Sequence, residues 1–137
     1  MTLTPYDELC AWTLSRGDPE FVHQHVVDAH MLQTAGDDVK PIGVAFALAG
    51  LYLYLRRGLT GREVQRVHMR LGQAGGPWPT FEAPGPRGTV TAADVMTVPA
   101  GPERVSAIRD WCMSVWAAWS SHEDEVVAFL RRYRVVP

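Results

Sequence analysis

The residues of this chain best suited to chemistry are four polar side chains within residues 23–33 and one histidine near the C-terminus. The four are His23, Asp28, His30 and Gln33, and the C-terminal histidine is His122. An imidazole binds metal ions, exchanges hydrogen bonds and transfers protons near neutral pH. These residues are therefore the first candidates for a binding or catalytic site.

His122 is expected on an apolar stripe of the last predicted helix. At about 100° per residue, six large apolar side chains project within roughly 60° of it on a helical wheel. They are Ile108, Trp111, Val115, Trp119, Val126 and Phe129. An imidazole in that setting is partly desolvated and needs a hydrogen-bond or metal partner inside the fold. We therefore expect His122 close to His23 or His30, in a pocket that Trp119 also borders.

A metal site is one interpretation of these histidines. His23 and His30 lie two helical turns apart, about 10.5 Å along the axis, whereas single-helix chelates use residues three or four apart. A divalent metal such as zinc would need ligands from separate helices, and His23, His30 and His122 are the candidates. The alternative is a core histidine, with His122 hydrogen-bonded to Asp28, Gln33 or a carbonyl group.

Three classes of function remain open from these residues. The favoured class is a binding protein with an inter-helix histidine pocket for a metal ion or a small molecule. The second is a small enzyme that uses His122 with His23 or Asp28 as an acid/base pair. The third is a helical module that forms a homodimer or binds a partner through an exposed apolar face.

Composition and charge limit the classes of partner that the chain is expected to bind. The chain has 137 residues, 47% hydrophobic and 20% charged, with a formal net charge of −2, as is ordinary for one globular domain spanning 1–137. Without a basic field, nucleic-acid binding is not expected. A ridge of arginines suits a phosphate or an acidic partner, but such a ridge is more often a solvated face. Its members are Arg56, Arg57, Arg62, Arg66 and Arg70.

Cysteine usage and hydropathy point to the cytoplasm. Cys10 and Cys112 form no CxxC motif, and both are expected to be buried free thiols. The most hydrophobic run, residues 42–55, is 14 residues long and falls short of the ~20 needed to cross a bilayer. We expect it to be the central helix of the fold. No basic-then-apolar N-terminal segment indicates secretion, and no membrane association is expected.

Capping residues and apolar periods predict an all-α fold, a single-domain helical bundle of four long helices plus a short helix in a Gly/Pro-rich connector. Helices are expected at about 5–16, 19–35, 41–57, 61–71, 91–96 and 102–134. The last is expected to bend around Ser120 and Ser121. The connector, residues 72–102, carries Trp78, Phe81 and Val90, so it is expected to pack on the bundle as an ordered segment.

The chain also resembles an uncharacterised bacterial family, the domain of unknown function number 5946. The resemblance rests first on residues 22–33, read as VHQHVVDAHMLQ, which is similar to a family helix that reads HHLTVDAY followed by Gln. It continues through residues 50–58, 88–95 and 111–122, and so covers nearly the whole chain.

By match to the family, the recurring polar positions are His23, Asp28, Gln33 and His122. The sequence departs from the family pattern at His30, where a Tyr is usual, and at Gln24 and Glu123, where a second His is common. The family brings no established activity, so the resemblance implies a fold and a site rather than a function.

Overall fold

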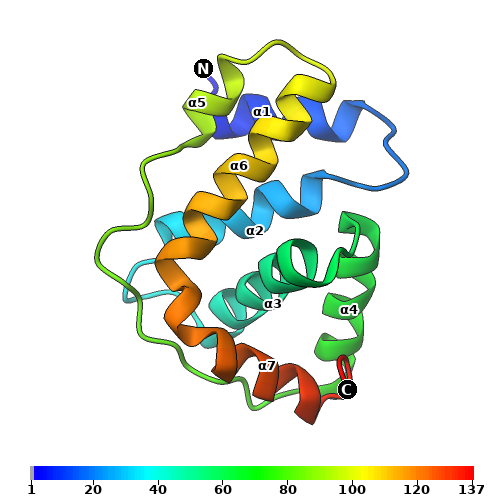
Figure 1. Ribbon diagram of the computed structural model, residues 1–137, viewed down its shortest axis with the longest axis vertical. Helices are drawn as coiled ribbons and strands as arrows, with labels where there is room; N and C mark the ends of the chain where they lie inside the picture. Colours follow the sequence, from blue (N-terminus) through cyan, green and yellow to red (C-terminus); the bar gives the residue numbers. More distant parts are fainter. Residues whose placement is uncertain (1) are drawn as a thin grey trace.

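The computed structural model describes residues 2–137 and is all-helical over that range, with loops between the helices (Figure 1). The elements are α1 (Pro5–Ser15), α2 (His23–Thr34), α3 (Pro41–Arg57), α4 (Gly61–Ala74), α5 (Ala92–Met96), α6 (Pro102–Trp119), the 3₁₀ turn η1 (Ser120–His122) and α7 (Glu123–Arg132). The predicted all-α class is confirmed, and the four longest helices are α2, α3, α4 and α6.

Three helices begin with the same local arrangement. Thr4, Thr60 and Thr91 each accept a hydrogen bond from the backbone N–H three residues later, and the acid at that later position accepts one in return. These capping boxes satisfy backbone donors that a helix start otherwise leaves unpaired. The predicted starts of α1 and α4, and that of the short helix α5, therefore hold.

The second helix begins later than the sequence predicts. The Asp18 carboxylate accepts hydrogen bonds from the backbone N–H groups of Glu20 and Val22, which stabilises a turn rather than a helix start. Phe21 follows with a φ of 55°, a left-handed conformation that cannot continue a right-handed helix. The regular helix therefore begins at His23, and residues 18–22 form the link from α1.

Helix α3 lies at the centre of the bundle, as the hydrophobic run at 42–55 predicts. It packs against α2, α4, α6 and α7, and its residues 47–53 are all buried. Small residues on α3 allow the close approach of α2, most visibly at Gly50, where an added Cβ would overlap the Asp28 carboxylate. No helix within residues 2–137 combines the length and apolarity that crossing a membrane requires.

The last predicted helix is divided into α6 and α7 by the turn η1. The break falls at Ser120 and Ser121, where the sequence predicts a bend, and the Ser120 hydroxyl donates to the Ala117 carbonyl oxygen. The predicted stripe on both sides of the break is confirmed by burial. Its six members, Ile108, Trp111, Val115, Trp119, Val126 and Phe129, are all 0% exposed. The turn leaves His122 at the edge of this stripe, with its side chain 17% exposed.

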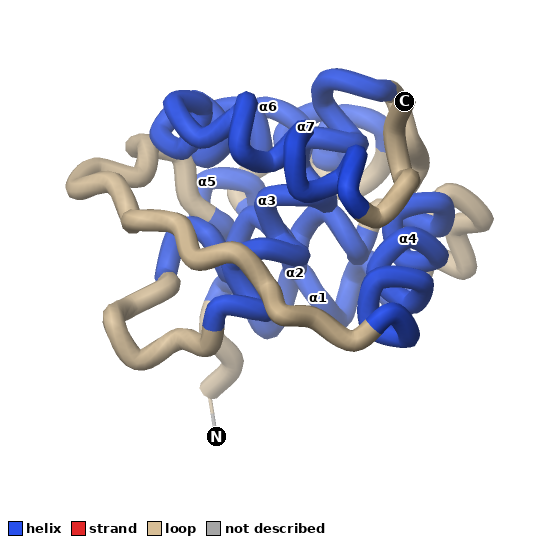
Figure 2. The backbone as a smooth tube through the Cα atoms, turned by 90° about the horizontal axis from the view of Figure 1, so that it is seen from below, coloured by secondary structure: helices blue, strands red, loops and turns tan. Residues whose placement is uncertain are grey.

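The connector between α4 and α5 runs across the bundle as a long tan segment in Figure 2. Trp78 makes edge contacts with Phe46 and Phe129, and Phe81 is buried. Because these aromatic side chains pack into the core, the connector is an ordered segment, as predicted. It crosses the bundle to reach α5, which lies against α1 and α6.

Candidate functional site

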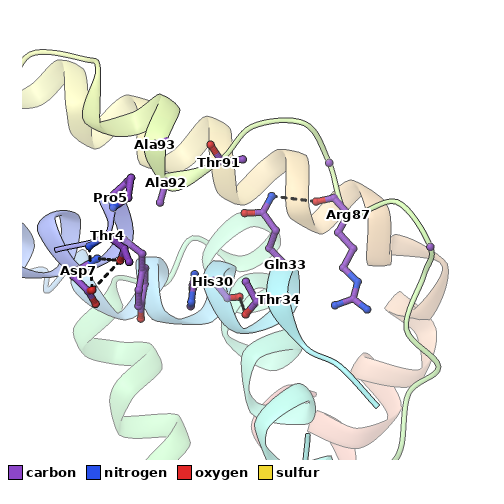
Figure 3. Close-up of a pocket in the computed structure, with 13 residues that line it drawn as sticks. Thr4, Pro5, Asp7, His30, Gln33, Thr34, Arg87, Thr91, Ala92 and Ala93 are labelled. Atoms are coloured by element: carbon purple, nitrogen blue, oxygen red, sulfur yellow. Dashed lines mark hydrogen bonds between the residues drawn. The ribbon is translucent and has the colours of Figure 1, made fainter. Parts of the chain in front are cut away.

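A pocket of about 990 Å³ opens between the start of α1, the second half of α2, the connector and α5 (Figure 3). Two residues singled out from the sequence, His30 and Gln33, line it. The lining consists of Thr4, Pro5, Tyr6, Asp7, His30, Gln33, Thr34, Gly85, Arg87, Gly88, Thr91, Ala92 and Ala93. The pocket therefore lies between helices, and of the predicted histidines it includes His30.

His30 supplies the free polar group of this pocket. Its ring stacks on Tyr6, with centroids 3.5 Å apart and planes 8° apart. Within residues 2–137, neither ring nitrogen of His30 has a hydrogen-bond partner. Burial lowers the pKa of His30, and the Asp7 carboxylate opposes that shift. The imidazole is consequently neutral at pH 7, with one nitrogen able to donate and the other to accept.

Gln33 lies three residues after His30 on α2 and holds the connector at the pocket. Its side-chain nitrogen donates to the carbonyl oxygens of Val90 (2.7 Å) and Arg87 (3.3 Å), and its oxygen accepts from the Trp111 Nε1–H at 3.0 Å. One amide thus joins α2, the connector and α6. Because its oxygen and its nitrogen both have partners in the protein, Gln33 positions the connector rather than offering a free group to a ligand.

The end of α2 is held by two side chains. Arg87 donates to the carbonyl oxygens of Leu32 and Ala35, and the Trp119 Nε1–H donates to Leu32 at 3.2 Å. These carbonyls belong to the last turn of the helix, which otherwise lacks partners. In Figure 3 the Arg87 guanidinium points away from His30. Trp119 therefore anchors α2 to α6 and does not line the pocket.

His122 does not share a site with the histidines of α2, contrary to the prediction. Its Nε2 lies 2.7 Å from the Glu82 carbonyl oxygen and its Nδ1 2.9 Å from Glu125 Oε1. Partial burial lowers its pKa, but the hydrogen bonds to Glu125 and Glu82 outweigh burial and raise the pKa above the ordinary value. His122 thus bonds a carbonyl group of the connector, one of the partners named in the core-histidine alternative.

The three histidines of the predicted metal site are held by different neighbours. His23 Nδ1 lies 2.8 Å from the Thr13 hydroxyl at the α1–α2 joint, while His30 stacks on Tyr6 and His122 bonds the connector. In the described part of the chain, no group of three or more His, Cys, Asp or Glu side chains is arranged to hold a metal ion. The predicted zinc-type set is therefore not assembled.

Asp28 lies in the core rather than in a pocket. It is 3% exposed, its Oδ1 accepts from the Gln24 side chain at 3.1 Å, and its Oδ2 has no partner among the described residues. Burial raises its pKa well above the ordinary value. The predicted acid/base pairing of His122 with His23 or Asp28 is not present, because His122 bonds Glu125 and Glu82 instead.

Sequence reasoning missed Tyr6, which forms the stacked wall with His30. No periodic signal connects the two, since they lie on different helices and meet through the packing of α1 on α2. It also did not indicate the surroundings of His25, whose ring stacks on Tyr54 at 3.5 Å, or of Trp116, whose buried Nε1–H has no partner within residues 2–137.

The fold and the pocket define an all-helical bundle with a histidine-bearing pocket between helices. The chain belongs to the family of unknown function DUF5946, whose family model matches residues 4–120. The match includes every residue of the pocket wall and ends within the turn η1, so the resemblance expected from the sequence is confirmed. No curated protein and no solved structure matches the chain.

Proposed function

We propose that this protein binds a small uncharged organic molecule in the pocket between α1, α2 and the connector. The observation that carries the proposal is the neutral His30 imidazole, which borders the pocket with both ring nitrogens free among the described residues. A ligand that both donates and accepts hydrogen bonds would satisfy it. Such a site has the usual form of a small-molecule pocket, an apolar surface with few free polar groups.

The threonine and glutamine side chains of the lining support this assignment, because each already bonds within the protein. Thr4 and Thr91 exchange hydrogen bonds with the acids of their capping boxes, and the Thr34 hydroxyl donates to the His30 carbonyl oxygen. The Gln33 amide is likewise engaged at both ends. Unlike these side chains, His30 keeps free hydrogen-bonding capacity for a neutral ligand.

The shape and charge of the pocket favour a flat, uncharged ring. The Tyr6–His30 stack presents parallel aromatic planes, and aromatic rings prefer offset-stacked neighbours. The Asp7 carboxylate lines the same pocket, while the Arg87 guanidinium is committed to α2 carbonyls. An anionic ligand would meet Asp7 without a free cation, so a neutral heteroaromatic molecule fits better.

The test is a titration of ¹⁵N-labelled protein with neutral heteroaromatic probes such as adenine, indole and benzamide. The ¹⁵N resonances of the His30 ring are expected to shift on binding of at least one probe. The variant H30F keeps a ring to stack on Tyr6 and removes both nitrogens. We expect it to weaken binding about tenfold, the effect of losing one to two kilocalories per mole of hydrogen bonding.

The matched control is H68F, which makes the same chemical change at a histidine of α4 outside the pocket. Its affinity for the probe is expected to equal that of the unmodified protein. Equal binding by H30F and the unmodified protein would refute the role of His30. If none of the probes gave a saturable shift, the pocket would be refuted as a site for this ligand class.

The cytoplasm is the compartment in which we expect the protein to act.

A further inference from the structure

A second, smaller pocket lies where the link from α1 to α2 meets the turn between α3 and α4 and the first half of α6. It has a volume of about 290 Å³, at the lower end of the range of small-molecule sites. None of its lining residues lines the pocket of His30. It is therefore a separate site, and its size restricts it to a small ligand.

His25 gives this pocket an unused hydrogen-bonding group. The residue lines the pocket, is 3% exposed and stacks on Tyr54, which also lines it. No described residue bonds either ring nitrogen, and of the two only Nδ1 is fully enclosed. Nε2 is therefore accessible to solvent, and it opens into the pocket because the exposed part of His25 borders it. Burial and the Arg109 charge lower the pKa of His25 to about 4, so at pH 7 the ring is neutral.

Charges of both signs border the same pocket without pairing directly. Arg16 and Arg109 supply two positive charges, and Asp18 and Glu20 supply two negative charges. Within residues 2–137 no ion pair joins any of these four side chains to another. The charges of Arg109 and Asp18 both act on the His25 imidazole, so both signs lie close to the same ring. A ligand with a single charge would leave the side chains of like charge without a partner.

Arg16 and Asp18 both keep bonding capacity for a ligand. The Arg16 guanidinium lies over the Trp12 ring, 4.8 Å from its centroid, and no described residue hydrogen-bonds to its N–H groups. Asp18 accepts one backbone N–H at each carboxylate oxygen, which leaves each oxygen a second lone pair. Arg109 contacts the Tyr54 ring at 5.3 Å and contributes mainly its charge. A carboxylate therefore suits Arg16, and an ammonium group suits Asp18.

We propose that this pocket binds a small free α-amino acid, whose carboxylate pairs with Arg16 and whose ammonium group pairs with Asp18. The zwitterion has no net charge, and the charges of the lining likewise cancel. It carries an acceptor and a donor, so His25 Nε2 finds a partner in either tautomer. The rest of the lining includes the apolar side chains of Val22, Leu59 and Val105, which favour a short aliphatic side chain such as that of alanine.

The experiment follows the ¹⁵N resonances of the His25 ring, assigned as those lost in H25F, during titrations at pH 7 and constant ionic strength. The ligands are alanine, propionate, which lacks the amino group, and ethylammonium, which lacks the carboxylate. We expect a saturable shift with alanine and an affinity about tenfold higher than for either single-charge analogue. Equal affinity for propionate or for ethylammonium would overturn the amino-acid assignment in favour of a simple anion or cation site. No saturable shift with alanine would refute the site.

The variants test the two contacts separately. R16Q is expected to weaken alanine binding about tenfold or more, through loss of a charged hydrogen bond. R57Q removes the same charge from an exposed position of α3 outside the pocket, and its affinity is expected to be unchanged. Unchanged alanine binding in R16Q would refute the carboxylate contact.

D18N removes the negative charge and keeps one oxygen for a backbone N–H of the link. We expect D18N to bind alanine several-fold more weakly and propionate with unchanged affinity, because propionate has no ammonium group. An equal loss for both ligands would show that Asp18 acts through the fold of the link and would overturn its contact with the ammonium group.

Discussion

At the scale of single residues, burial sets the protonation of the histidines. His25 is 3% exposed, and burial together with the Arg109 charge lowers its pKa to about 4. Burial also lowers the pKa values of His23, His30 and His68. These four imidazoles are neutral in the folded protein at pH 7. At acid pH the histidines of the unfolded chain take up protons more readily than these buried imidazoles do.

The stability of the protein should therefore fall as the pH decreases from about 6.5 to 4. Over that range the unfolded chain protonates its histidines while folded His25 stays neutral, so the unfolded state binds more protons. The shift of His25 corresponds to about 3 kcal/mol lost by pH 4. The variant H25F keeps a ring against Tyr54 and should show a flatter pH dependence in urea unfolding. An unchanged pH dependence in H25F would show that folding does not lower the pKa of His25.

The buried Asp28 gives a prediction of the opposite sign. Its pKa is raised by burial, so the folded protein binds its proton more tightly than the unfolded chain does. Ionisation of Asp28 at high pH therefore costs folding free energy. D28N keeps the oxygen that accepts from Gln24 and removes the charge.

We expect D28N to be more stable than the unmodified protein by about 1–3 kcal/mol at pH 8, with a smaller difference at pH 5. Urea unfolding at the two pH values provides the measurement. A loss of stability at pH 8 would mean that the ionised carboxylate stabilises the fold.

At the scale of the helices, local sequence accounts for the ends and tertiary packing accounts for the rest. Thr4 and Thr60 predict helix starts because their hydroxyls and the acids three residues later form capping hydrogen bonds within one turn. The start of α2 could not be read this way, because Asp18 resembles a cap and in fact holds a turn that leads into left-handed Phe21. The hydrogen bonds that the Asp18 carboxylate accepts within residues 18–22 therefore determine where α2 begins.

Two helical glycines give a matched prediction about the packing of α2 on α3. A Cβ at Gly50 would overlap Asp28 Oδ2, whereas a Cβ at Gly72 of α4 would meet open space. G50A should lower the free energy of unfolding by about 1–3 kcal/mol through overpacking. G72A should raise it by about 0.5–1 kcal/mol, because alanine favours a helix. Chemical unfolding of both variants checks the pair, and a stable G50A would contradict the close contact.

At the scale of the whole molecule, the path of the connector determines which of the candidate site residues lie close together. Two of the residues singled out from the sequence, His30 and Gln33, line a pocket between helices. The partner of His122 could not be predicted, because the Glu82 carbonyl comes from a segment without periodicity. The helical wheel also assumes one continuous helix, and the turn η1, which includes His122, interrupts it.

The connector should loosen when its central bond is removed. Q33M keeps the length of the side chain but leaves the buried Trp111 N–H and the Val90 carbonyl without Gln33. We expect a loss of about 1–3 kcal/mol in stability and faster amide hydrogen exchange in residues 85–91. Q73M changes an exposed glutamine of α4 and should alter stability by less than about 0.5 kcal/mol. Unchanged exchange in Q33M would show that aromatic packing alone holds the connector.

The way in which the connector is held bears on how this family can diverge. The side chains of Gln33, His122 and Tyr133 contact the connector at backbone carbonyl oxygens, those of Val90, Glu82 and Pro77 among them. Every amino acid supplies that oxygen, so these contacts do not depend on the identity of the residues that accept them, whereas Trp78, Phe81 and Arg87 hold the segment through their side chains. Substitutions at exposed connector positions such as Glu82 can therefore accumulate without moving the wall of the pocket.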